Sequence, residues 1–164
     1  MKQALLFSRI DLELTQIQVM TDQTKRMLEK VESTGDLDYL GTVALNLQSF
    51  YTAVERIFIA IAKEIDTTVP KQENWHQALL EQMAVEIPRT RQAVLAIETY
   101  QGLDEFRRFR HVVRSNYAHQ LDPNKVQELA RKLDGISQDV IKDCQQFCTA
   151  VNSLDGDEDI REIT

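Results

Sequence analysis

The amino-acid sequence predicts an all-α fold, an up-and-down helical bundle of four main helices with a short connecting helix. Apolar residues recur at steps of three and four over long segments, as they do on one face of a helix. Only 5 glycines and 3 prolines occur among 164 residues, which is too few for a turn-rich β fold. The breaks between the periodic segments are short, and short connections favour antiparallel neighbouring helices.

The first two helices are predicted from the longest periodic segments. Residues 2–33 form an amphipathic pattern that ends before Gly35, because glycine readily adopts the left-handed conformation that follows a helix. Asp36 or Asp38 can then cap the next helix. Residues 38–65 carry the most apolar pattern of the chain, so we expect this second helix to lie at the centre of the bundle.

A short helix is predicted in the connection that follows. Periodicity is lost over residues 66–73, which indicates a loop. Asn74 can cap a helix over residues 75–85, and Pro88 ends it because the residue before a proline disfavours helical geometry.

The third main helix is predicted in two pieces. Periodic residues cover 90–100 and 103–119, and Gly102 between them marks a break or a bend.

The last helix is predicted to follow a clear stop and restart. Asp122 can cap it, and Pro123 suits its first position, where no backbone N–H is needed. Its periodicity continues to about Leu154. We therefore expect a single helical domain over residues 1–154 and an acidic, flexible tail over residues 155–164.

The composition indicates a soluble protein of the cytoplasm. Cys144 and Cys148 are four residues apart on one predicted helix, where the geometry suits a disulfide poorly, so a reducing compartment is expected. The apolar run before Arg9 is too short for a secretion signal or a membrane span. A metal pair at the cysteines would need further ligands that the spacing does not show, and we expect neither a metal nor another cofactor.

Positive charge is concentrated in one segment of an acidic chain. The net charge of −7 argues against general coating of nucleic acids. Within residues 103–120, however, four arginines against two acidic residues give +2, which leaves −9 on the rest of the chain. A local basic segment of this kind can hold an anion without binding every polyanion.

Helical spacing sorts the polar groups of residues 103–120 into two adjacent stripes. Their guanidinium, imidazole and hydroxyl groups suit metal-free RNA cleavage, in which a base removes the 2′-OH proton and cations stabilise the transition state. The alternative is a solvated helix face whose arginines pair with acids on neighbouring helices. The stripes comprise Arg107, Arg110, Arg114 and Tyr117, and Arg108, His111, Ser115 and His119.

Two further segments bear on this helix. Glu55 and Arg56 lie on the second predicted helix and could orient the arginines. Trp75 and His76 are interpreted as a packing anchor and a capping or surface group, the alternative being that His76 approaches a functional cleft.

Motifs in three parts of the chain resemble a known family. They are SFYTAVERIFIAIAKEID at 49–66, the W-H-x-x-L-L-x-x-M pattern at 75–83, and FRHVVR at 109–114 with Tyr117 and LDP at 121–123. Together they resemble the HepT-like ribonucleases of the HEPN superfamily over about residues 5–150. The resemblance implies an all-helical homodimer that cleaves RNA, tRNA or mRNA, without a metal.

The resemblance also implies a partner. It points to the toxin of a bacterial HEPN/MNT toxin–antitoxin pair, of a type VII-like system. The antitoxin would be a small nucleotidyltransferase of the MNT type that transfers AMP to a tyrosine beside the catalytic motif. That tyrosine falls on Tyr117.

The family's catalytic motif matches this chain with one departure. The motif arginine falls on Arg110 and its polar neighbour on His111, but Ser115 stands where a histidine is expected. A second register, from Arg114 to His119, restores the arginine–histidine spacing but loses the tyrosine.

Two functions follow from this departure. Either His111 or His119 is the acid or base, with Arg110 and Arg114 in the catalytic group and Arg107 and Arg108 also holding phosphate. The alternative is a non-catalytic helical subunit that binds nucleotide or RNA beside a nucleotidyltransferase.

Overall fold

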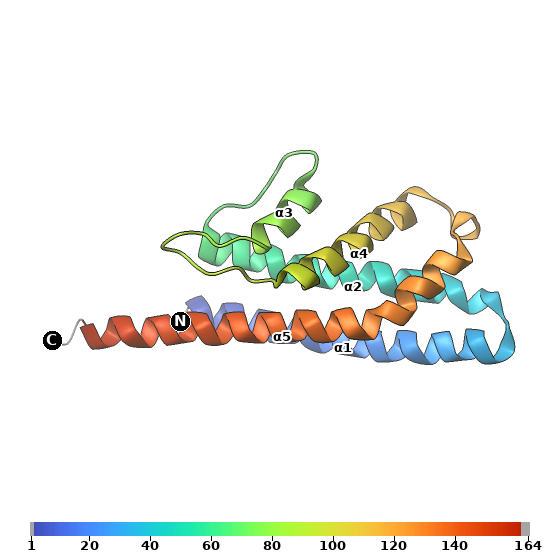
Figure 1. Ribbon diagram of the computed structural model, residues 1–164, viewed down its shortest axis with the longest axis horizontal. Coiled ribbons are helices and arrows are strands. Elements are labelled where there is room, and N and C mark those ends of the chain that lie inside the picture. The colour runs from blue at the N-terminus through green and yellow to red at the C-terminus, as the bar shows by residue number, and fades with distance from the viewer. Residues whose placement is uncertain (1, 162–164) are drawn as a thin grey trace.

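The computed structural model describes residues 2–161 and confirms the predicted all-helical bundle. The chain reverses direction from α1 to α2, again at α4 and again at α5, so α1 begins and α5 ends at the same end of the bundle (Figure 1). The short α3 lies in the connection between α2 and α4. The helices are α1 Lys2–Thr34, α2 Leu40–Ile61, α3 Trp75–Met83, α4 Ile97–Ser115 and α5 Pro123–Arg161.

The turn between α1 and α2 forms as its sequence predicts. Gly35 has φ +68°, a left-handed conformation, and its N–H donates to the Val31 carbonyl at 2.9 Å. The Asp36 side chain accepts a hydrogen bond from the Asp38 N–H at 2.9 Å and so caps the 3-10 turn Leu37–Tyr39 that leads into α2. These bonds satisfy backbone groups that the helix ends leave open.

The core is built around α2, which contacts all four other helices. Its aromatic side chains Phe50, Tyr51 and Phe58 are fully buried. The ring of Phe50 meets that of Phe106 on α4 edge-on, with centroids 5.3 Å apart, which is a favourable aromatic geometry. The central position expected for the most apolar helix is therefore confirmed.

A buried ion pair joins the π-helical turn Ala62–Asp66, which continues the end of α2, to the segment after α3. Arg91 Nε and Nη2 donate to the two carboxylate oxygens of Asp66 at 2.6 and 2.7 Å, and both side chains are 1% exposed. The remaining donors of the guanidinium bind the carbonyl oxygens of Gln82, Val85 and Gln92 at 3.0–3.1 Å. All five N–H groups of the arginine are thus satisfied, which a buried guanidinium requires.

The helix predicted over residues 90–100 forms only from Ile97, and the prediction is wrong for the residues before it. Ile87 and Arg91 instead exchange backbone hydrogen bonds across a turn in which Arg89 has φ +64°. The N–H groups of Val94 and Leu95 both donate to the Met83 carbonyl, and α4 begins only at Ile97. The apolar spacing that suggests a helix is used here by an irregular segment, because tertiary hydrogen bonds replace the helical ones.

The break predicted at Gly102 does not occur, since α4 runs through it without interruption. A Cβ atom at this position would lie 2.7 Å from Ile136 Cδ1, so the glycine allows α4 to approach α5 closely. The far end of the helix also differs from the prediction. It ends at Ser115 rather than near residue 119, because Asn116 has an extended backbone.

The start of α5 is confirmed and its end is not. Pro123 is its first residue, and the Asp122 carboxylate accepts from the Asn124 N–H at 3.0 Å. The helix continues to Arg161, beyond the predicted end near Leu154, while flexibility of the tail stays a prediction.

The two cysteines of α5 are free thiols. Burial raises the pKa of the Cys144 thiol and raises that of Cys148 to about 11, so both stay protonated near neutral pH. Within residues 2–161, no helix combines the length and the apolar character that crossing a lipid bilayer requires.

Loss of the buried ion pair is expected to destabilise the fold strongly. Arg91→Met leaves the Asp66 carboxylate buried without its partner and should lower the free energy of unfolding by about 3–5 kcal/mol. Arg131→Met, which breaks an exposed pair with Glu32, should cost less than about 1 kcal/mol. Urea denaturation followed by circular dichroism measures both. Equal losses in the two variants would contradict the importance given to the buried pair.

Candidate active site

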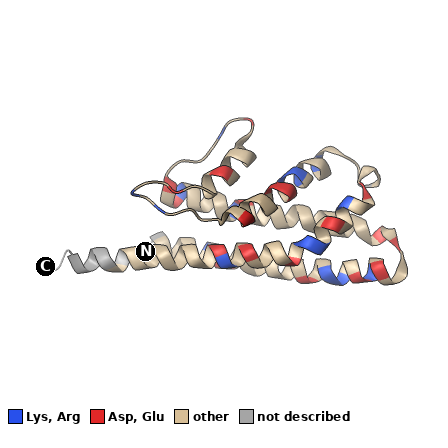
Figure 2. Ribbon diagram, viewed as in Figure 1, with Lys and Arg blue, Asp and Glu red and all other residues tan. Residues whose placement is uncertain are grey.

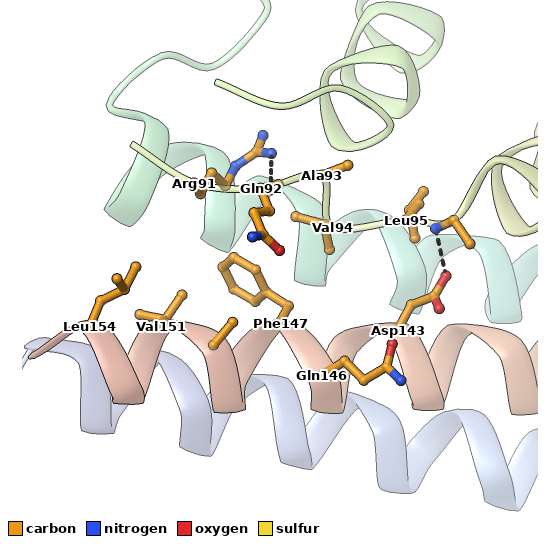
Figure 3. A pocket seen from close by; sticks show the side chains of 12 residues that line it. Arg91, Gln92, Ala93, Val94, Leu95, Asp143, Gln146, Phe147, Val151 and Leu154 are labelled. Atoms are coloured by element: carbon orange, nitrogen blue, oxygen red, sulfur yellow. Dashed lines mark hydrogen bonds between the residues drawn. The ribbon is translucent and has the colours of Figure 1, made fainter. Parts of the chain in front are cut away.

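Two hollows in the surface are candidates for a functional site. The first, of about 380 Å³, lies between residues 91–96 and α5, with Phe147 and Val151 among its apolar lining (Figure 3). Its charged lining residues are Arg91, which binds Asp66, and Asp143, which accepts from the Ala96 N–H at 3.0 Å. Both are committed to the fold, so this hollow offers no available charge for chemistry.

The second hollow, of about 460 Å³, is lined by three helices and is rich in positive charge. Arginines gather along the second half of α4, where the ribbon is coloured blue (Figure 2). We call this hollow the arginine cavity. Its functional side chains are Tyr51 from α2, His76 from α3, and Arg107, Arg110, His111, Arg114 and Ser115 from α4.

The arginines that line this cavity differ in their partners. Arg107 Nε donates to Asp104 on its own helix at 2.8 Å. Arg110 Nε donates to the Thr52 hydroxyl at 3.2 Å and lies 3.8 Å from a carboxylate oxygen of Glu55 on α2. Arg114 forms no ion pair with any residue in the described range 2–161. The interpretation as arginines paired with acids on neighbouring helices therefore describes Arg110 alone.

Arg108 does not join the other three arginines. It is 65% exposed, lies 3.4 Å from Asp104, and lines a separate hollow with Phe109 and Val112. The helical spacing had placed it on the stripe of His111, but the neighbouring helices bound two different hollows on the two sides of α4. Arg108 therefore does not share a hollow with Arg107, Arg110 and Arg114, and its contact with RNA or phosphate stays a prediction.

His111 and His119 occupy different places. His111 is exposed and lines the arginine cavity. Ser115, which replaces the expected histidine, also lines it, but its hydroxyl donates to the His111 carbonyl at 2.8 Å. A hydroxyl held in this way offers no proton acceptor near neutral pH.

Tyr117 and His119 lie beyond the end of α4 and outside the lining of the cavity. Their rings stack nearly parallel, with centroids 5.8 Å apart and 9° between the planes. Tyr117 is 72% exposed, so its hydroxyl is accessible from solvent. The predicted stripes assumed that the helix continued, and the extended backbone at Asn116 removes both residues from them.

His76 lines the arginine cavity, although its sequence position mainly indicates a capping or surface group. Its Nδ1 lies 2.5 Å from Oε2 of Glu55, whose side chain is 4% exposed. The ring also stacks on that of Trp75, with centroids 3.6 Å apart. The signal in the sequence is Glu55 itself, a carboxylate within the most apolar helix, because such a group needs a partner.

The expectation for the second helix is confirmed for Glu55 and wrong for Arg56. Glu55 contacts both Arg110 and His76. Arg56 is exposed and lies 3.8 Å from Glu13 on α1, away from the cavity.

Tyr51 provides a buried hydroxyl at the arginine cavity. The residue is fully buried, and its hydroxyl finds no hydrogen-bond partner among the described residues. Burial, with Glu55 nearby, raises the pKa of the Tyr51 phenol, so the hydroxyl stays a donor. The hydroxyl oxygen is closed off from solvent, so in this structure it cannot contact a molecule held in the cavity.

The described side chains form no cluster of metal ligands. Among the side chains that the structure describes, which exclude those of residues 155 and 157–164, no group of three or more His, Cys, Asp or Glu is placed to hold a metal ion. The chemistry available in the cavity is cationic stabilisation by arginine and proton transfer by histidine.

Comparison with known proteins identifies the family. A family model described as HepT-like protein matches residues 42–151, more than half of the chain. The chain belongs to the HepT-like proteins of the HEPN superfamily. No curated protein and no solved structure matches the chain. The matched range contains every element that lines the arginine cavity, so the cavity lies within the shared HepT-like region.

Removing the Tyr51 hydroxyl is expected to stabilise this HepT-like protein. A buried hydroxyl without a partner costs free energy, so Tyr51→Phe should raise the free energy of unfolding by about 1 kcal/mol. Urea denaturation measures the change, with Tyr39→Phe, at a half-buried tyrosine remote from the cavity, as the matched control. A loss of stability in Tyr51→Phe would show that the hydroxyl has a partner in the folded protein.

Proposed function

We propose that this HepT-like protein is the toxin of a bacterial type VII-like HEPN/MNT toxin–antitoxin pair, a metal-independent endoribonuclease that acts on tRNA or mRNA in the cytoplasm. The observation that carries the proposal is the arginine cavity. Three arginines and two histidines from two helices line one hollow in an otherwise acidic chain. This is the set of groups that cleavage of a phosphodiester by proton transfer needs.

The cations act on the phosphate. Arg110 and Arg114 bind the scissile phosphate and stabilise the charge that grows on its oxygens in the transition state, and Arg107 adds to the field. His111 is the acid or base on α4, since it lines the cavity with these arginines and His119 does not. Arg108 contacts RNA outside the cavity in this proposal.

The proposed regulation involves Tyr117. The partner is an MNT-type nucleotidyltransferase that adds AMP to this tyrosine. The 72% exposure of Tyr117 supports this proposal, because an enzyme can reach its hydroxyl without unfolding α4. An added nucleotide brings negative charge beside the end of the arginine helix and would compete with RNA there.

A homodimer is part of the proposal. Leu5, Leu12 and Val19 recur at intervals of seven along α1, and each is more than half exposed. A stripe of this spacing is typical of a helix face that packs on a partner. We propose that a second copy covers it.

A second function remains in view because of Ser115. The Ser115 hydroxyl donates to the His111 carbonyl, so the position where the family has a histidine supplies no acid or base in this chain. This favours a non-catalytic subunit that binds RNA or nucleotide through the same arginines, next to a nucleotidyltransferase. Binding without cleavage would identify it.

Cleavage of RNA is expected to continue in EDTA. The purified protein should leave 2′,3′-cyclic phosphate ends, because the 2′ oxygen attacks the phosphate without a metal. Arg110→Ala and Arg114→Ala should each lower the rate by about 10²-fold, through lost transition-state stabilisation. Gel analysis of RNA and its end groups measures both effects. The control is Lys142→Ala, which removes one exposed positive charge on α5. Cleavage that stops in EDTA, or full activity in both arginine variants, would contradict the proposed site.

Modification of Tyr117 is expected on co-expression with an MNT-type nucleotidyltransferase from the neighbouring reading frame. Peptide mass spectrometry should find AMP on Tyr117, because this phenol is accessible and the buried Tyr51 is not. The matched variant Tyr117→Phe should carry no AMP and should keep its toxicity in the presence of the partner. AMP on another tyrosine would place the regulatory site elsewhere.

A further inference from the structure

The contact between His76 and Glu55 brings an acid–base group to the arginine cavity from outside α4. The two side chains come from α3 and α2, and Nδ1 of the imidazole lies 2.5 Å from the carboxylate. Glu55 is almost fully buried, so its carboxylate has little water to bind. It is shared between the imidazole and Arg110, which lies 3.8 Å from its other oxygen.

This contact decides the chemistry of the histidine. A carboxylate that accepts the Nδ1 proton fixes the tautomer and leaves the lone pair on Nε2, and it stabilises the imidazolium that forms on proton uptake. Nε2 has no hydrogen-bond partner within residues 2–161, and the side chain is 29% exposed at the cavity. Stacking on Trp75 further restricts the ring.

His111 has no carboxylate partner of this kind among the described residues. Its side chain is exposed and makes no hydrogen bond to a described residue. Of the two histidines at the arginine cavity, His76 is therefore the one built to accept a proton. We propose that His76 is the general base of the proposed ribonuclease, oriented by Glu55, and that it supplies the function lost where Ser115 replaces a histidine. This inference rests on the proposed function.

Two protons move in the proposed step, one onto His76 and one from His111. Nε2 of His76 takes the proton of the ribose 2′-OH while the 2′ oxygen bonds to phosphorus and the bond from phosphorus to the 5′ oxygen breaks. The leaving 5′ oxygen takes a proton from the imidazolium of His111. The products are a 2′,3′-cyclic phosphate and a 5′-OH, with the proton on His76 and His111 neutral, and exchange with water restores both.

The surroundings of the histidine fit this step. Arg110 is held by Thr52 at 3.2 Å and by the same Glu55 that binds the imidazole, so the base and the phosphate-binding cation have a common support. Such fixed supports keep reacting groups in place.

The decisive variant is His76→Asn, because an asparagine amide can still donate to Glu55 but has no equivalent of Nε2. Its rate of RNA cleavage should fall about 10²–10⁴-fold, the usual contribution of a general base. Its affinity for a 2′-deoxy oligonucleotide, measured by fluorescence anisotropy, should be unchanged. The control on the same helix is Glu81→Ala, an exposed residue outside the cavity, which should cleave RNA at the wild-type rate.

A rescue experiment separates proton transfer from a structural role. His76→Ala leaves space beside Trp75, and free imidazole added to this variant should restore part of the cleavage. The same imidazole should not restore Arg110→Ala, whose defect is a missing cation. Absence of rescue in His76→Ala, with a wild-type rate in His76→Asn, would overturn the proposal.

Glu55 is a positioning residue in this scheme and has its own test. Glu55→Gln should lower kcat with KM unchanged and alter the shape of the pH–rate profile, because a neutral amide does not stabilise the imidazolium. A raised KM with kcat unchanged would instead assign Glu55 to the binding of RNA through Arg110.

The outcomes for the two proposals are distinguishable. If the wild-type protein does not cleave RNA, the proposed function fails, and the role of His76 fails with it. If the wild type cleaves and His76→Asn cleaves equally well, only the role of His76 is overturned.

If the variants do not fold, chemical modification of the histidines of the wild-type protein with diethyl pyrocarbonate tests the role of His76. Modification of His76 should inactivate the enzyme and should be prevented by the 2′-deoxy oligonucleotide, whereas full cleavage activity with His76 modified would overturn the proposal.

Discussion

The buried ion pair between Asp66 and Arg91 is the contact on which the position of the candidate site depends. It joins the π-helical turn that continues the end of α2 to the segment that follows α3, and the same guanidinium binds the carbonyl oxygens of Gln82 and Val85 at the end of α3. A buried guanidinium must have all its donors paired, so few arrangements of this connection are acceptable. The pair thereby holds α3 against α2, which brings His76 to Glu55. His76 lies at the start of α3, and Arg91 binds the Gln82 carbonyl near the end of the same helix. Charge pairing at one end of α3 therefore positions the histidine at the other end.

Glu55 is the second support, because it is where the three helices of the cavity meet. Its carboxylate lies between an imidazole from α3 and a guanidinium from α4.

The distribution of charge along the chain also favours the arginine cavity as the place where an anion binds. The segment 103–120 carries +2 and the rest of the chain −9, so the acidic body should repel RNA except where arginines offer a site. The same acidic surface is available to a basic partner protein. In the proposed function, selectivity for one site thus comes from charge arrangement rather than from total charge.

Local sequence patterns predicted those helices whose backbone N–H and C=O groups pair within the helix or its own caps. α1 and α2 follow their apolar spacing, Gly35 and Asp36 make the turn between them, and Pro123 begins α5. The prediction over residues 90–100 failed before Ile97 because the N–H groups of Val94 and Leu95 bond to the distant Met83 carbonyl instead of to helical partners. The sequence predicts a break or a bend at Gly102, yet α4 continues through this residue, and the glycine allows close packing against Ile136. Periodicity reports which side chains are buried, but it does not report which backbone groups pair with one another.

The sequence by itself determined the helical class, the concentration of arginines on one helix and the family, because each depends on residue type and spacing within a segment. Only the tertiary structure decided which of these groups share a cavity. It separated Arg108 from Arg107, Arg110 and Arg114, placed Tyr117 and His119 beyond the end of α4, and added His76 and Tyr51 from other helices. The physical reason is that helical spacing fixes directions around one axis only. Which directions face one another depends on how the helices pack, and here a buried ion pair and a shared carboxylate fix that packing.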